Sequence, residues 1–191
     1  MKKIISIIII TALLTILSAC AEEIITPTRG SWNGNTFTSE YMELRLVIPE
    51  HPWRIYSDYE IAQQRQFYEY EIDFFVRQTQ TESSIALTFK RLHDDDFCIH
   101  EYLEACGTRE AETFAAINLT ATHTIETTPL AGIEWITKRT EIRHEAEVIA
   151  LQIHLASIES GYLRCLHFRV HDDAHFQKIA SWFSWHRGAT Q

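Results

Sequence analysis

The segment from residue 151 to residue 170 constrains the fold most, because its strand register can be deduced from the sequence. If Ser160-Gly161 forms a two-residue turn, Ile153 faces Phe168 on an apolar side of the hairpin, and His154 faces His167 on the other side. A shift of one residue would mix the two sides. The sequence therefore predicts an antiparallel hairpin with one side in the core.

Apolar residues alternate with polar ones in several other segments, which predicts further strands. The expected strands span residues 41–48, 68–76, 85–89, 122–128 and 133–142, and Pro129 and Gly132 are placed in the turn between the last two. Asn33-Gly34 is a tight-turn signal. Because consecutive strands are joined by short turns, the sheet is expected to be antiparallel.

Three helices are expected between or after these strands. Ser57 and Glu60 have the spacing of a capping box for a short helix that ends near residue 66. A second helix is expected over residues 97–117, with a break at Gly107 as an alternative, since glycine costs about 1 kcal/mol there. A third begins at Asp172 or Asp173 and turns four residues inward, with Trp182 or Trp185 also packing: Phe176, Ile179, Ala180 and Phe183. The fold class is therefore α+β, an antiparallel sheet with helices packed on its faces.

The first twenty residues have the pattern of a secretory signal that ends in a lipidation site. Two lysines precede an apolar run that is shorter than the ~20 residues of a membrane span. Leu17-Ser18-Ala19-Cys20 then has the form of a bacterial lipobox, in which the cysteine thiolate takes a diacylglyceryl group. We expect residues 1–19 to be a signal peptide and Cys20 to be lipidated. The alternatives are a non-lipidated signal and an uncleaved N-terminal anchor.

This assignment predicts a domain organisation and a location. Residues 20–31 form the lipidated cysteine and a polar tether, and residues 32–191 form a single domain. The protein is expected to be held by its lipid on the extracytoplasmic side of the cell membrane, as a monomer. Its formal net charge of −9 and the lack of a basic cluster argue against nucleic acid as a partner.

Three cysteines remain after Cys20, namely Cys98, Cys106 and Cys165. An odd number excludes a complete disulfide framework. Cys98 and Cys106 are eight residues apart, which on one helix is ~12 Å and too far for a bridge. One bond and one free thiol are compatible with an extracytoplasmic site, but we expect small, buried, unpaired thiols.

The segment SWNGNTFTSEYMELRLVIPEHPWRIYSDYEIA, residues 31–62, resembles the opening of a family of small secreted lipoproteins from Gram-positive bacteria. The shared features are a tryptophan, a glycine turn, an aromatic-threonine pair, a strand ending in proline, and an Asp-x-Glu-Ile helix start. The resemblance implies a PsbP/Mog1-like α/β/α sandwich. The sequence departs from the family pattern at two places. Glu43 stands where the family commonly has glycine, and His51-Pro52 replaces a glycine turn. The family supplies no catalytic residues, and PsbP and Mog1 relatives imply protein partners by analogy of fold.

Two groups of side chains carry metal-ligand types. His154 and His167 face each other across the hairpin at ~5 Å and are weak candidates for one metal ion, without an evident third ligand. The acidic runs at 93–96 and 171–175 contain histidine and aspartate, but Asp at a helix start is favoured as a cap. We therefore predict no metal and no cofactor.

No motif for nucleophilic catalysis or phosphate binding occurs in the sequence. We expect a surface lipoprotein with a non-catalytic binding or accessory domain that contacts the membrane through Cys20 and binds a protein partner. The alternative is a small-ligand or metal-binding lipoprotein associated with a transporter. A deep pocket would favour the alternative, whereas a broad exposed apolar patch would favour a protein partner.

Overall fold

The computed structural model describes residues 27–65, 70–93 and 97–186 of the protein. A seven-stranded antiparallel sheet runs, in spatial order, through β4 (Trp53–Ile55), β5 (Glu71–Gln78), β6 (Ser84–Arg91), β10 (Tyr162–Val170), β9 (Glu147–Glu159), β8 (Ile133–His144) and β7 (Thr120–Leu130). A four-stranded sheet contains β1 (Ser31–Asn33), β2 (Thr36–Ser39), β3 (Leu44–Val47) and β11 (Phe183–Trp185). The predicted signal peptide, Cys20 and the first part of the predicted tether lie outside the described residues.

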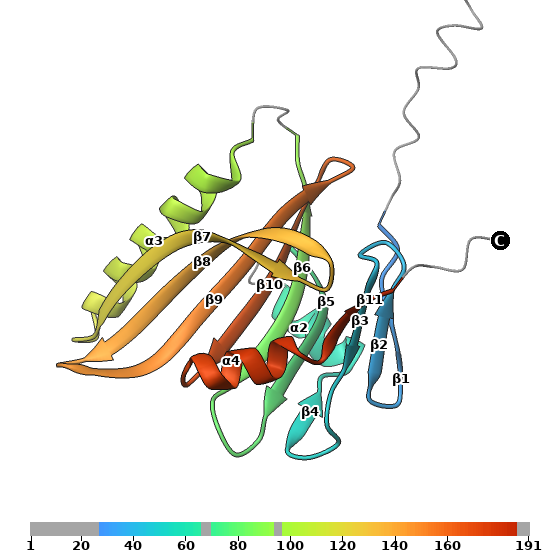
Figure 1. Ribbon diagram of the computed structural model, residues 1–191, viewed down its shortest axis with the longest axis horizontal. Coiled ribbons are helices and arrows are strands. Elements are labelled where there is room, and N and C mark those ends of the chain that lie inside the picture. The colour runs from blue at the N-terminus through green and yellow to red at the C-terminus, as the bar shows by residue number, and fades with distance from the viewer. Residues whose placement is uncertain (1–26, 66–69, 94–96, 187–191) are drawn as a thin grey trace, which may run out of the picture.

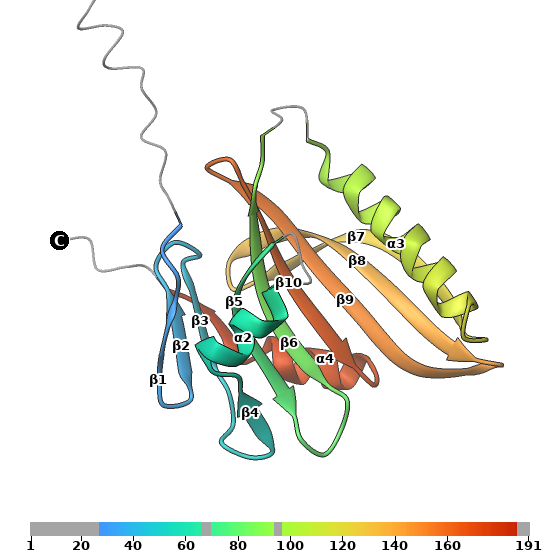
Figure 2. The same ribbon diagram turned by 180° about the vertical axis from the view of Figure 1, so that it is seen from behind.

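Helices and the small sheet cover the two faces of the large sheet differently. In Figure 1, α4 (Asp173–Ala180) lies in front of the large sheet, and the small sheet stands beside it. Figure 2, seen from behind, brings α2 (Asp58–Arg65) and α3 (Ile99–Ala115) to the front. We call the first side the α4 face and the second the α3 face. The α+β class and the helices packed on the sheet are confirmed, and the four-stranded sheet is an addition that the strand prediction missed.

The hairpin of β9 and β10 has the predicted register, with His154 opposite His167 and Ile153 opposite Phe168. Ser160 and Gly161 both have positive φ, 50° and 76°, as the type I′ turn of a two-residue hairpin requires. The turn chemistry and the alternation of side chains therefore select the same register.

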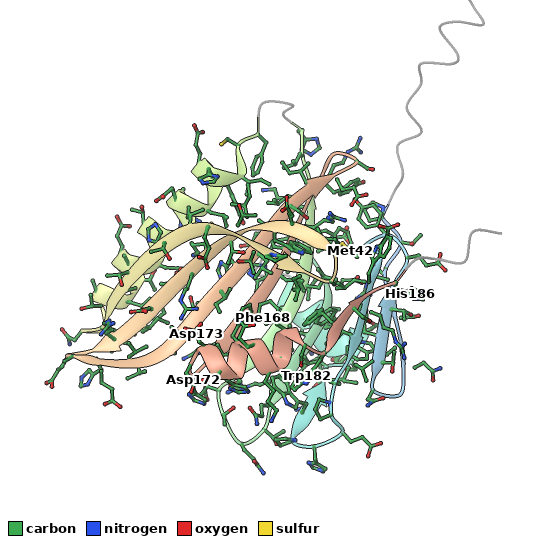
Figure 3. The ribbon with its side chains drawn as sticks, viewed as in Figure 1. Met42, Phe168, Asp172, Asp173, Trp182 and His186 are labelled. Carbon is green, nitrogen blue, oxygen red and sulfur yellow. The ribbon has the colours of Figure 1, made fainter. Side chains whose placement is uncertain are left out.

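The main core lies on the α4 face. Phe168 of β10 stacks edge-on against Phe176 of α4 and Phe183 of β11, with ring centroids 5.2 and 5.7 Å apart. Figure 3 shows Phe168 beneath α4, whose N-terminal end carries the labelled Asp172 and Asp173. Every one of the buried side chains at the centre of this face is at most 3% exposed: Leu44, Leu46, Ile85, Leu87, Leu151, Ile153, Leu155, Leu166, Phe168, Val170 and Ile179.

Helix starts are set by local capping. Ser57 and Glu60 form the predicted capping box, since the Ser57 backbone N–H donates to Glu60 Oε2 at 2.9 Å. The Asp172 carboxylate accepts the backbone N–H of His175 at 2.7 Å and so caps α4, as predicted. The N-cap of α3 is Cys98, which makes no side-chain capping bond. The acidic residues 94–96 before it are outside the described residues.

Several boundaries differ from the sequence prediction. Helix α3 continues through Gly107 without a break. Glycine is needed at this position because the helix backbone lies close to the ring of His123. Pro129 lies within edge strand β7, and the turn is formed by Ala131 and Gly132, both with positive φ. Phe183 is buried as predicted, but it belongs to β11 and not to α4.

The structure also shows how the two C-terminal tryptophans pack and how the turn at Glu43 forms. Trp182 packs edge-on against Trp53 with centroids 5.3 Å apart, whereas Trp185 is 47% exposed. Glu43, which stands where the resembling family has glycine, has a φ of 47° in the left-handed region. Its carboxylate accepts the indole N–H of Trp185 at 3.1 Å, which stabilises this turn without a glycine. No helix among the described residues is long and apolar enough to cross a membrane.

Candidate functional site

A cavity of about 400 Å³ opens on the α3 face of the large sheet, beneath α2. Its walls come from β5, β6, β9 and β10, from α2 and from the segments that flank α2 and β5. The lining residues are Tyr56, Ile61, Tyr70, Ile72, Phe75, Ala86, Thr88, Gln152, His154 and His167. None of these ten side chains is a carboxylate, an ammonium or a guanidinium group. The cavity is of the size that holds a small organic molecule.

The floor of the cavity follows one row of residues that runs straight across neighbouring strands. In the strand register, Lys138 pairs with His154, His154 with His167, and His167 with Ala86. Phe75 of β5 continues the row beside Ala86. Because side chains directly opposite each other lie on one face of a sheet, this row places the charged and polar residues at one end and Phe75 at the other.

Small side chains explain why this part of the α3 face is hollow. Ala86 occupies the centre of the floor, where a single methyl group leaves the space between Phe75 and His167 unfilled. The covering helix α2 has only eight residues and reaches the cavity with Ile61. Larger side chains from α3, such as Leu103, instead pack further along the sheet against Cys165 and Leu163.

The polar end of the cavity is a connected cluster. The rings of His154 and His167 are 4.7 Å apart between centroids and cross at 74°. The Thr88 hydroxyl and His167 Nε2 are hydrogen-bonded at 2.8 Å. On the outer side, Glu110 of α3 lies 3.7 Å from His154 Nδ1 and 2.5 Å from the Lys138 ammonium group.

Glu110 offsets the charge of a lysine that has no access to water. The side chain of Lys138 is 0% exposed, and its ammonium group forms the ion pair with Glu110 but no well-directed hydrogen bond within the described residues. Thr140 donates a second contact to Glu110, at 3.0 Å. Breaking such a pair leaves an uncompensated charge in the interior. Glu110 therefore fixes α3 to β8 at the rim of the histidine pair.

Both histidines are held neutral. Burial and, to a smaller extent, the positive charge of Lys138 together lower the pKa of His154 to about 3. Burial, His154 and Lys138 also keep the pKa of His167 well below 6.5, against the opposing effect of Glu110. At neutral pH each ring therefore offers one hydrogen-bond donor and one acceptor and carries no charge.

The structure brings His154 and His167 together as predicted, but it adds no third ligand. Among the described residues, no group of three or more histidine, cysteine or acidic side chains is close enough for a metal ion. The burial and the Lys138 charge that disfavour a proton here also disfavour a divalent cation. The expectation that the protein holds no metal ion stays a prediction. His171 and His175 stack with centroids 6.1 Å apart on the surface at the start of α4.

The three cysteines of the described chain are unpaired, as predicted, but they are not all buried. Cys98 is exposed as the N-cap residue of α3, and Cys106 is half-buried, so the expected burial is correct for Cys165 alone. Cys165 lies beneath α3, and burial raises its pKa to about 12. A thiol with such a pKa is protonated at neutral pH and unreactive.

The end of the predicted tether is docked beside the cavity. The carboxylate of Asp73, of which 2% is exposed, accepts the backbone N–H of Gly30 at 3.1 Å and lies 3.7 Å from the Arg29 guanidinium group. Arg29 also donates to the Asp73 carbonyl at 3.1 Å. A β-bulge between Ile72 and Phe74 turns Asp73 toward these partners. We call this arrangement the Arg29–Asp73 clasp.

Sequence reasoning did not identify Lys138, Glu110 or the small floor residues. The residues of β8 that face α3 are Ile136, Lys138 and Thr140. Because this face mixes apolar and polar side chains, the alternation along the strand does not indicate that Lys138 is buried. Glu110 had a detectable signal, because it follows the inward-facing Gly107 by three residues on α3 and so lies on the same helix face. Strict alternation along the strand expected at 68–76 would turn Asp73 outward with Glu71, but the bulge turns it inward.

The fold defined by these sheets and helices is PsbP-like. A solved structure with this fold is PsbP (CyanoP) of the cyanobacterium Synechocystis sp. PCC 6803, determined in solution. The two structures align with a TM-score of 0.53 over 85% of this chain and 99% of that chain, at 12% sequence identity. This likeness confirms the PsbP-like part of the predicted resemblance and concerns the fold alone. No protein-family model and no curated protein matches the chain.

Proposed function

We propose that the protein is a lipid-anchored, extracytoplasmic binding protein of the Gram-positive type, and that its domain holds a small ligand in the cavity beneath α2. The observation that carries this proposal is the cavity itself, about 400 Å³ of space with mostly apolar walls and a few polar groups at one end. Ligand sites in proteins have this composition. The proposal favours the small-ligand alternative over a protein partner.

The anchoring part of the proposal rests on the lipobox at Leu17-Ser18-Ala19-Cys20. Lipidation of Cys20 would leave about nine residues before Arg29, and these span at most ~30 Å. The Arg29–Asp73 clasp would then keep the cavity near the membrane surface. Mass spectrometry of the N-terminal peptide tests this part: Cys20 should carry acyl chains, and Cys20→Ser should release the protein from the membrane.

We propose no catalysis at this site. Thr88 and His167 have the distance of a hydroxyl nucleophile and its base, 2.8 Å. However, a histidine whose pKa lies well below 6.5 is a poor base at neutral pH. The lining residues also contain no cysteine, serine, carboxylate or lysine. These features favour holding a ligand over transforming it.

Docking of a protein partner is a second candidate, and the edge strand β7 favours it. This strand has eleven residues and, within the described part of the chain, pairs with β8 only, which leaves its other edge for an added strand. By contrast, the exposed large hydrophobic side chains of the described chain are spread over several elements: Val47, Tyr59, Ile117, Ile149, Ile158 and Trp185. Cross-linking at the native membrane, followed by identification of the captured protein, tests this candidate.

The direct test of the cavity is a substitution that fills it. The core residues lie between Phe37 and Phe183, so a chain that starts at residue 21 keeps the whole core and avoids the lipid. Ala86→Leu should place three further carbon atoms on the cavity floor. We expect saturable binding of the uncharged fluorophore phenylnaphthylamine to the parent chain, and at least about tenfold weaker binding to Ala86→Leu.

Ala174→Leu is the matched control, because Ala174 is exposed at the start of α4 on the other face. It should bind the fluorophore like the parent chain. Equal binding by all three chains would show that the fluorophore occupies another place. Absence of binding to the folded parent chain would contradict the ligand-cavity proposal.

A further inference from the structure

The cavity also indicates which ligands it accepts, if the proposed binding function is correct. We infer that it selects electroneutral ligands, with a largely apolar body and one uncharged hydrogen-bonding group such as a hydroxyl or a carbonyl. Anions such as carboxylates and sulfonates, and cations such as amines, are excluded. Three properties of the site support this inference: its walls, the balance of charge behind its polar end, and its hydrogen-bonding groups.

Among the described residues, the walls provide no charged partner for a ligand. Charged residues make up 23% of the chain, yet none of the ten lining side chains belongs to this class. Moving an ion out of water costs several kcal/mol unless a counter-charge or several hydrogen bonds receive it. Ile61, Ile72 and Phe75 provide neither, but they offer apolar contact to a ring or chain.

The two charges behind the polar end form one ion pair. Lys138 lies next to His154 in the sheet row, and Glu110 is paired with it at 2.5 Å. An anionic ligand next to the histidines would be attracted by Lys138 and repelled by Glu110, and a cationic ligand would experience the reverse. Because the two charges are 2.5 Å apart in one ion pair, each weakens the field of the other at the rings, and neither sign of ligand charge gains enough to offset its lost hydration.

The remaining groups suit one uncharged polar group on the ligand. His167 uses Nε2 for the bond to Thr88, which leaves its other ring nitrogen. The 3.7 Å between His154 Nδ1 and Glu110 is too long for a hydrogen bond. Gln152 lines the same end of the cavity and adds an amide donor and acceptor. A ligand hydroxyl can both donate to and accept from such a set, and a ligand carbonyl can accept from it.

Two fluorophores with the same ring system separate charge from shape. Phenylnaphthylamine is uncharged, and anilinonaphthalenesulfonate carries a sulfonate on the same skeleton. For the chain from residue 21, we expect the uncharged fluorophore to bind at least about tenfold more tightly than the sulfonate. Equal affinities would overturn charge selection while leaving the cavity function intact. Failure of both to bind would contradict the proposed function itself.

Glu110→Gln tests the role of the charge balance. This variant leaves Lys138 as an uncompensated positive charge, so the affinity ratio should move toward the sulfonate by about tenfold or more. In Lys138→Met/Glu110→Gln both charges are absent, and the parent preference for the uncharged fluorophore should return. If Glu110→Gln does not fold, the fluorophore preference of the double variant still tests the inference. A folded Glu110→Gln protein with an unchanged ratio, or a double variant that prefers the sulfonate, would overturn the inference.

Discussion

The two faces of the seven-stranded sheet use alternate residues of the same strands, yet they are packed in opposite ways. On the α4 face, Leu155, Leu166 and Phe168 are at most 2% exposed and are covered by α4 and the small sheet. On the α3 face, their neighbours His154 and His167 border an open cavity. One face can therefore supply the stability that allows the other to remain hollow and polar.

The largest expected effect comes from removing a large side chain from the α4 face. Phe168→Ala removes a ring that contacts Phe176 and Phe183, and it should lower the free energy of unfolding by about 3–5 kcal/mol. Urea unfolding followed by tryptophan fluorescence measures this loss. Phe75→Ala is the matched change on the α3 face, where the side chain already borders empty space. If Phe75→Ala costs as much as Phe168→Ala, the two faces do not differ as described.

The next effect concerns the charged pair of the α3 face. Glu110→Ala leaves the Lys138 ammonium group buried without a counter-charge, and we expect a loss of about 2–4 kcal/mol in the free energy of unfolding. Lys138→Met/Glu110→Ala should recover most of this loss, because no charge is then buried. Chemical denaturation of both variants gives the comparison. A double variant as unstable as the single one would show that the pair contributes packing and little electrostatic energy.

Acid should weaken the α3 face through its histidines. The pKa of His154 is near 6.5 in the unfolded chain and about 3 in the folded protein. Between these values the unfolded chain binds more protons, so the free energy of unfolding falls as the pH drops below 6.5. The loss attributable to His154 is about 2 kcal/mol at pH 5, with Lys138, Glu110 and His167 as the ionisable groups that face it.

Urea midpoints at pH 7 and pH 5 measure this dependence. His154→Gln keeps a polar side chain without a proton-binding site in this range, so its midpoint should change less between the two pH values. The same pH dependence in both proteins would mean that other groups cause the acid sensitivity.

The smallest effect tests the contact between α3 and β7. Gly107→Ala would place a methyl carbon 2.5 Å from the His123 ring, so it should destabilise by about 1 kcal/mol despite the better helix propensity of alanine. In a His123→Ala background the same substitution should instead stabilise by up to about 1 kcal/mol. Thermal melting of the four proteins measures the coupling. Additive effects would show that the ring moves aside without cost.

The sequence predicted the regular parts of this molecule because their signals are local. The register of β9 and β10 follows from Ser160-Gly161 and the alternation around it, and the start of α2 follows from Ser57 and Glu60. The small sheet was missed because β1, β2 and β11 have only three or four residues, too few to show a period.

The candidate site was predictable only in part. His154 and His167 were placed opposite each other from the hairpin alone. The cavity was not foreseen, because it depends on what α2 and α3 leave uncovered above Ala86, and this is a property of packing between distant segments. The pairing of Lys138 with Glu110 likewise joins residues on different elements, so no pattern within either segment indicates it.

The Arg29–Asp73 clasp joins the N-terminal segment mechanically to β5. Tension on the chain upstream of Arg29 reaches the domain first at the bulge of β5, through the ion pair and the Gly30 hydrogen bond, and only then at β1. The bulge lies next to Ile72, which forms part of the cavity wall. A pull on the N-terminal segment therefore acts mechanically on the same strand that shapes the cavity.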